Sequence, residues 1–196
     1  MKTKRLKIYQ DSDIDGPREW DNLGEIVGSC RSYRLYDVKN PYSGEGGSHL
    51  EDFKLYLKDK NLKLDDVVYL PVYAYIHSGV TINTKGYSCP WDSGQVGYIW
   101  VSKEKIRNEY SISRVTSKWV DRIEGYLNNE IEIFAQYIEG DVYSFSVEEW
   151  DPTPGVGWVV TDSCAGFYGT DWDTNGIKDY IPDDLVRELE DIEIEW

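Results

Sequence analysis

The sequence lacks a long apolar run, and this absence excludes a membrane-spanning helix. No stretch of the 196-residue chain approaches the roughly 20 apolar residues that a transmembrane helix needs. The first residues, MKTKRLKIYQDSD, are basic and then acidic, without the apolar centre of a secretory signal. We therefore expect no membrane partner, and we expect the protein to stay in the cytoplasm.

Cysteine and histidine are also scarce. The three cysteines, Cys30, Cys89 and Cys164, are odd in number and widely spaced, which favours reduced thiols over a disulfide framework. The cysteines and the two histidines stand singly and give no C-x-x-C or H-x-x-H pair. The sequence therefore does not predict a zinc site.

Motifs of nucleophilic and phosphate chemistry are missing as well. There is no G-x-S-x-G, and SGEGG lacks the lysine of a phosphate-binding loop. If the protein is an enzyme, the candidate catalytic residues are His77, Cys89 and Asp92, which lie near the ends of predicted strands. A Cys–His pair needs hydrogen-bond reach, which this spacing does not guarantee. The alternative is a tight loop shaped by Pro90 and Asp92, with Trp91 packed underneath.

Basic residues are nearly absent from the C-terminal end. Residues 139–196 contain 2 Lys/Arg and 16 Asp/Glu, a net charge of −14, whereas residues 1–138 contain 19 and 20. Such a surface repels phosphate, so we expect no direct nucleic-acid partner and instead a protein with a basic surface. The candidate contacts are Asp183, Asp184 and Glu188. A solvated acidic face that aids solubility is the alternative.

Tyrosine and tryptophan are in excess, with 16 and 8 residues against 4 phenylalanines. These side chains combine an apolar ring with a polar tip, so they suit wet core edges as well as binding surfaces. The excess fits a core and its rim, and equally the interface of a homodimer or a surface on which nucleotides stack.

Apolar periodicity predicts an α+β protein. The longest helical pattern runs from about 114 to 139, where apolar residues recur at three- or four-residue steps. Strands and helices do not alternate regularly, so we expect one domain with a mainly antiparallel sheet packed by this helix and by shorter ones. The acidic segment, 170–196, is expected to contain a terminal helix that starts at Pro182. Strands are predicted at 5–10, 65–84, 94–102, 141–150 and 155–162. The stretch 65–84 is either one long strand or two strands broken near Pro71 and Gly79.

Two stretches have the aspartate spacing of a calcium loop, DSDIDG at 11–16 and DWDTNG at 171–176. A full EF-hand loop also needs an apolar residue at position 8 and a glutamate at position 12. Both stretches have a basic residue at position 8, and Asn22 or Pro182 stands at position 12. Two Asx-rich turns are therefore favoured. A divalent cation such as calcium is the alternative, and no other cofactor is indicated. The candidate ligands are Asp11, Asp13, Asp15, Asp171, Asp173 and Asn175.

A polar cluster surrounds one tryptophan in the stretch PREWDN. It is either a binding patch or a corner in which the polar groups satisfy one another and Asp21 and Asn22 cap turns. Trp91 and Asp92 are further candidates for binding. The members of the cluster are Arg18, Glu19, Trp20, Asp21 and Asn22.

Five motifs, PREWDNLG, LPVYAYIHSGVTINT, SCPWDSGQVGYIWVSKEKIR, EGDVYSFSVEE and DSCAGFYG, resemble an uncharacterised family of proteins from bacteriophages and other mobile elements. The resemblance extends from about residue 8 to residue 169 and does not reach the acidic end. It implies a context, the cytoplasm of a bacterial host cell, in which small accessory proteins often counteract host defences. It implies no catalytic residue and no cofactor.

These observations favour a non-enzymatic protein that binds and inhibits a host protein, such as a defence protein, through an acidic surface. One alternative is a small metal- or Cys-dependent hydrolase that uses the acidic turns or the group around Cys89. A second alternative is a nucleotide-binding sponge that uses the surplus aromatic side chains.

Overall fold

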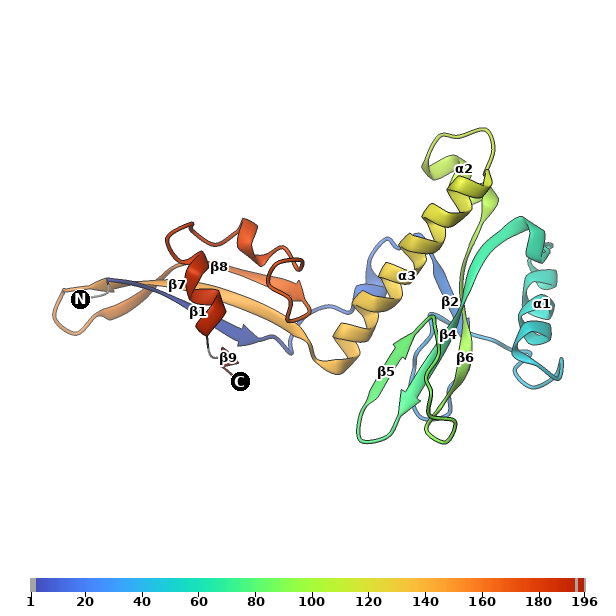
Figure 1. Cartoon of the computed structure of the whole chain (residues 1–196), viewed down its shortest axis with the longest axis horizontal. Coiled ribbons are helices and arrows are strands. Elements are labelled where there is room, and N and C mark those ends of the chain that lie inside the picture. The colour runs from blue at the N-terminus through green and yellow to red at the C-terminus, as the bar shows by residue number, and fades with distance from the viewer. Residues whose placement is uncertain (1–2, 193, 196) are drawn as a thin grey trace. The chain divides into compact units, whose positions relative to one another are not determined.

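The computed structural model describes residues 3–192 and 194–195, and it confirms the α+β class (Figure 1). The expected single domain is built from two compact units. Unit 1 combines Met1–Asp15 with Gln136–Trp196, and unit 2 is the continuous segment Gly16–Ala135. Each unit contains one sheet, and antiparallel pairs predominate in both.

The sheet of unit 1 has the strand order β8-β7-β1-β9. Its strands are β1 (Lys4–Gln10), β7 (Val142–Asp151), β8 (Gly157–Tyr168) and β9 (Ile194–Glu195). The alternation that predicts β1 fixes its register, because Leu6 and Ile8 are both buried and lie opposite Val147 and Phe145 of β7. Only the short β9 runs parallel to its neighbour.

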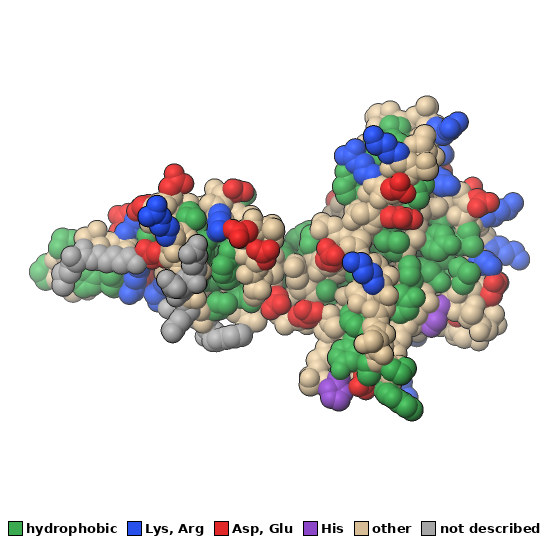
Figure 2. Space-filling view, viewed as in Figure 1, with side chains coloured by type: hydrophobic (Ala, Val, Ile, Leu, Met, Phe, Trp, Pro, Cys, Tyr) green, Lys and Arg blue, Asp and Glu red, His purple; other side chains and the backbone are tan. Residues whose placement is uncertain are grey.

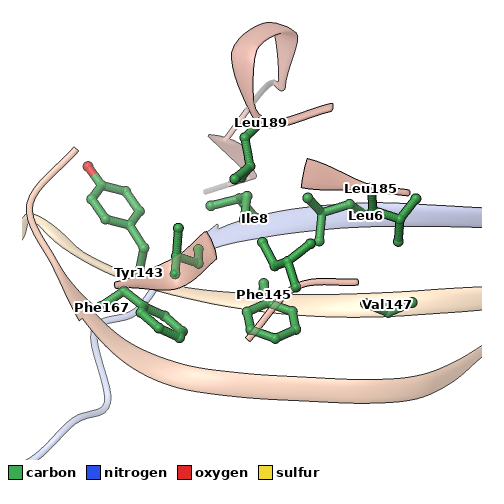
Figure 3. Close-up of a cluster of buried hydrophobic side chains, with 10 residues drawn as sticks. Leu6, Ile8, Tyr143, Phe145, Val147, Phe167, Leu185 and Leu189 are labelled. Atoms are coloured by element: carbon green, nitrogen blue, oxygen red, sulfur yellow. The ribbon is translucent and has the colours of Figure 1, made fainter. Parts of the chain in front are cut away.

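The C-terminal segment closes the core of unit 1. Four apolar residues at four-residue intervals, each at most 4% exposed, turn toward the sheet. Figure 3 shows two of them, Leu185 and Leu189, beside Leu6 and Ile8 of β1. We call residues 170–192 the acidic cap. The four anchors are Ile177, Ile181, Leu185 and Leu189.

The terminal helix predicted from Pro182 is present only in part, and it is a 3-10 helix rather than an α-helix. The cap contains two 3-10 helices, η3 (Ile177–Asp179) and η4 (Val186–Asp191), and the chain then enters the sheet as β9. Acidic residues at the end of a helix oppose its dipole, and residues 188–191 include three of them. Residues 193 and 196, which the prediction also covered, lie outside the described residues.

The sheet of unit 2 has the order β3-β2-β6-β4-β5. The long Tyr- and Val-rich stretch is divided at Gly79 and not at Pro71, which lies within β4. Gly28 and Gly97 face each other across β2 and β6, and a Cβ on Gly97 would lie 2.2 Å from the carbonyl oxygen of Val27. The strands are β2 (Glu25–Gly28), β3 (Val38–Lys39), β4 (Val67–Ile76), β5 (Val80–Asn83) and β6 (Ser93–Ser102).

Helices cover both faces of this sheet (Figure 1). On one face, α1 (His49–Asp59) packs Phe53 against Tyr98 and Trp100 of β6. On the other face, Leu127 of α3 (Ser117–Glu139) meets Ile99 of β6 over Gly24, where a Cβ would lie 2.5 Å from the leucine. The remaining helices are α2 (Lys103–Glu109), η1 (Pro17–Glu19) and η2 (Leu64–Asp66).

The long helix α3 (Ser117–Glu139) confirms the strongest periodic pattern. Its buried stripe includes Ile123, Leu127 and Ile131, and Gly140, with φ of 81°, follows its last residue. No helix in the described part of the chain is long and apolar enough to cross a membrane.

Candidate functional site

The PREWDN stretch forms one wall of a cavity of about 370 Å³ in unit 2. The stretch begins with η1, whose first residue, Pro17, is buried and supplies the fixed φ that suits a helix start. The opposite wall comes from β2 and from the end of β6. The polar and aromatic lining includes Arg18, Trp20, Asp21, Asn22, Glu25, Asp37, Trp100 and Lys105.

Arg18 is the centre of a partly buried ion network. Its guanidinium contacts Asp37 through two bonds, of 2.6 and 3.1 Å, and Glu130 of α3 at 2.8 Å. It also donates to the carbonyl oxygen of Gly24 at 2.8 Å. Only 11% of the side chain is exposed. Burial alone lowers the pKa of Arg18, but the bonds to Asp37 and Glu130 outweigh it, and the net pKa is raised.

The two carboxylates of this network also hold the backbone. Asp37 accepts from the amide of Ile26 at 2.7 Å, and Glu130 accepts from the amide of Leu23 at 2.9 Å. Glu130 thereby ties α3 to the turn that precedes β2. Charge-assisted bonds of this kind are the strongest hydrogen bonds in proteins, so the network fixes the wall of the cavity.

Of the other members of the predicted cluster, one is bonded within the PREWDN turn, two lie at the rim of the cavity and one lies outside it. Asn22 donates to the carbonyl oxygen of Pro17 at 2.8 Å and belongs to the corner. Trp20 and Asp21 line the cavity with exposed side chains. Glu19 is exposed as well and is not among the lining residues. The corner is thus present at Asn22, and binding at the exposed rim stays a prediction.

Glu25 connects the cavity to the aromatic core of unit 2. Its Oε1 accepts from the Tyr56 hydroxyl at 2.6 Å and from Trp100 Nε1 at 3.1 Å. Burial raises the pKa of Tyr56, and the bond to Glu25 raises it further. The phenol is therefore held neutral beside the carboxylate.

Replacing Tyr56 with phenylalanine should make unit 2 less sensitive to alkaline pH. Below about pH 10, the ordinary pKa of tyrosine, both states keep the proton and its contribution to stability is complete. Above that pH the unfolded state loses the proton first, so the free energy of unfolding falls as pH rises. Urea unfolding between about pH 9 and about pH 11 measures this slope. Y33F, which changes an exposed tyrosine, is the control. If the free energy of unfolding of Y56F falls with pH as steeply as that of the original protein, Tyr56 is not the residue that makes unit 2 sensitive to alkaline pH.

The structure brings the three candidate catalytic residues together at one end of the unit 2 sheet. The carboxylate of Asp92 lies 3.3 Å from His77 Nδ1 and accepts from the Cys89 thiol at 3.7 Å. Ser93 donates to the carbonyl oxygen of Cys89, and Ile76 N–H donates to that of Asp92. The carboxylate thus stands between thiol and imidazole, whereas a catalytic pair needs the imidazole beside the thiol.

Trp91 does not pack underneath this loop as expected, because 89% of its surface is exposed. The turn directs the side chain of Asp92 toward His77 and Cys89, and its neighbour Trp91 is left outside. A hollow of about 630 Å³ near this turn is lined by Tyr73, Tyr87, Lys85 and Gln95, among others.

The two aspartate-rich stretches have the geometry of Asx turns. Asp11 accepts from the amide of Asp13 at 3.2 Å, and Asp171 accepts from the amide of Asp173 at 3.0 Å. Asp173 also pairs with Lys178. Among the described side chains, no group of three or more His, Cys, Asp or Glu converges as a metal site would require. Asp15 is exposed. The Asn175 side-chain amide donates to the carbonyl oxygen of Gly169 and accepts from the amide of Ile177.

The acidic cap presents its charge outward. Unit 1 contains 6 Lys/Arg and 19 Asp/Glu, a net of −13, whereas unit 2 contains 15 and 17. The β1 cations Lys4 and Arg5 are engaged by Glu149 and Glu148 of β7, so they do not neutralise the cap. Figure 2 shows acidic side chains over this part of unit 1, with a few Lys and Arg side chains among them. Among the cap side chains that the structure describes, the exposed acids are Asp171, Asp173, Asp179, Asp183 and Asp184, and Glu188 is half-buried.

Comparison of the chain with protein-family models, with curated proteins and with solved structures gave no match. Sequence reasoning missed Asp37, Glu130 and Lys105, which complete the PREWDN site. Glu130 could have been found from the sequence, because a carboxylate next to the apolar stripe of α3 is a candidate for a partly buried ion pair. Nothing in the local sequence distinguishes Asp37 or Lys105.

Proposed function

We propose that the protein is a non-enzymatic binding protein that docks its acidic cap on the basic surface of another protein. The observation that carries the proposal is the construction of the cap. Anchors such as Ile181 and Leu185 are buried in the core of unit 1, while the intervening Asp183 and Asp184 are exposed. The carboxylates are thus held in place before a partner arrives, which reduces the entropy lost on binding.

The charge of unit 1 supports a cationic partner. A net of −13 on one unit attracts basic proteins over a Debye length and raises their rate of association. The same field repels the phosphates of nucleic acids. The resemblance to mobile-element proteins suggests a host protein as the partner and inhibition as the result of binding.

The group around Asp92 is the observation that favours the alternative, a small Cys-dependent hydrolase. His77 and Cys89 both contact one carboxylate, so a modest side-chain movement would bring imidazole and thiol together. Alanine at Cys89 or His77 separates the proposals. It leaves partner binding intact if the protein is a binder, and it abolishes the biological effect if the protein is a hydrolase.

Reversing the charge of the cap tests the proposal directly. The double variant D183K/D184K should lose the partner that the original protein recovers from bacterial lysate, with affinity at least roughly tenfold weaker. The recovery should also fall steeply as salt is added.

The matched control places the same charge change on unit 2. Asp65 and Asp121 are exposed there, so D65K/D121K alters the net charge equally without touching the cap. Equal recovery of the partner by D183K/D184K and by the control, or recovery that is insensitive to salt, would refute docking through the cap.

A further inference from the structure

Strand β8 is an open edge of the unit 1 sheet. Within the described residues it pairs with β7 alone, while β7 also pairs with β1. The outer side of an edge strand presents unpaired N–H and C=O groups, which form a template for another strand. Figure 1 shows the turn of the β7–β8 hairpin extending past the acidic cap.

This edge has few of the features that usually prevent pairing. The strand, GWVVTDSCAGFY, contains no proline, lysine or arginine and a single charged residue, Asp162. Val159 and Val160 are 41% and 54% exposed, and β-branched residues of this kind favour added strands. Edge strands normally carry lysine, proline or inward charges as protection.

Irregular pairing with β7 divides the edge into two regular stretches. The register shifts between Val147 and Glu148, where Thr161 has no counterpart, and again near Gly166. Such bulges bend a strand. They leave residues 157–160 and 162–165 in regular pairing, so a short added strand fits better than a long one.

A hollow lies beside the second stretch. It measures about 630 Å³ and is floored by small side chains, including Ser144, Ser146, Ser163 and Ala165. Successive side chains of a strand point to opposite faces, so every second side chain of an added strand would lie on the face that contains the hollow. The hollow has room for an apolar side chain at such a position.

Charge decides between the classes of occupant. The hairpin 142–168 contains four acidic residues and no lysine or arginine. Glu148 and Glu149 are engaged by β1, and Asp151 of β7 accepts from the amide of Thr153, which leaves Asp162 as the acidic residue of the edge strand itself. A second copy of the chain would place one unit with a net charge of −13 against another with the same charge. A basic segment is complementary to this charge.

We propose that the β8 edge binds an extended basic segment of the partner protein as an added strand. The inference rests on the proposed function and deepens it, because it gives the same cationic partner a mode of recognition. Main-chain bonds along β8 supply affinity, and alternate side chains supply specificity. In the added strand of the partner, a lysine or arginine lies near Asp162, and apolar residues lie over the hollow and beside Val160.

A synthetic peptide that alternates lysine and valine tests this mode on the full-length protein. Hydrogen exchange is followed with and without the peptide, and the expected result is exchange at residues 157–165 slowed roughly tenfold or more. The control is the same peptide with all backbone amides N-methylated, which keeps charge and side chains but removes the donors. It should give no protection at β8.

Each outcome separates the inference from the function it rests on. If both peptides bind equally and in a salt-dependent manner, but β8 is not protected from exchange, strand addition is overturned. Docking on the acidic surface is then still supported. Absence of binding by either peptide overturns both. Protection of β8 without peptide, together with a dimer in sedimentation, identifies a second copy as the occupant and overturns the inference.

Discussion

Replacing Arg18 with alanine is expected to lower the free energy of unfolding of unit 2 by about 3 to 5 kcal/mol. The guanidinium is 11% exposed and bonds Asp37, Glu130 and the carbonyl oxygen of Gly24. Its removal leaves two carboxylates, 23% and 15% exposed, without their cation. An uncompensated charge of this kind is far more costly than a lost surface pair.

Urea unfolding followed by tryptophan fluorescence measures the effect. R18K should lose much of the stability too, because lysine cannot reproduce the two-bond contact with Asp37. K54A is the control, since Lys54 forms an exposed pair with Glu51 and its loss should change stability little. If R18A is no less stable than K54A, the network does not hold the PREWDN wall in place.

Replacing Leu185 with alanine is expected to cost about 2 to 5 kcal/mol of stability in unit 1. Leu185 is buried among Leu6, Ile8 and other apolar residues, so truncation leaves a cavity beneath the acidic cap. Since the cap has no long α-helix, its anchors hold it in place. The variant should therefore release the segment 170–192.

Limited proteolysis reports the release, and urea unfolding reports the stability. The neighbouring D184A is the control, because Asp184 is exposed and its removal leaves the core intact. L185A should also bind the cationic partner less tightly although every carboxylate remains, because the acids are no longer held in place. Proteolysis of L185A no faster than that of D184A would contradict the anchoring role.

Local patterns were sufficient to predict the long regular elements but not the short strands β2, β3 and β9. The apolar stripe of α3 and the alternation of β1 each reflect one buried face. The division into two units was not predictable, because it depends on β1 pairing with β7 across more than a hundred residues. The residues near each strand in the sequence do not indicate which distant strand it pairs with.

The candidate sites were predictable only in part. The composition of PREWDN marked it as unusual, but the partner of Arg18 on α3 is 112 positions away. The exposure of Trp91 depends on where Asp92 bonds, and the spacing of residues does not encode that. In the acidic cap, the anchors at four-residue spacing lie in 3-10 helices and turns rather than in one α-helix, and their spacing alone did not distinguish these structures.

The insertion of unit 2 into unit 1 has a consequence for the order of folding. β1 is made first, but its partner strand begins at Val142, and the bond from Arg5 to Glu148 spans 143 positions. Unit 2 is continuous and can fold while synthesis proceeds. Until β7 emerges, Leu6 and Ile8 have no sheet to enter, so β1 must remain unpaired throughout the synthesis of unit 2. The pairing of β1 with β7 is therefore a late event, and the pace of translation sets how long that apolar strand stays accessible to chaperones or to other chains.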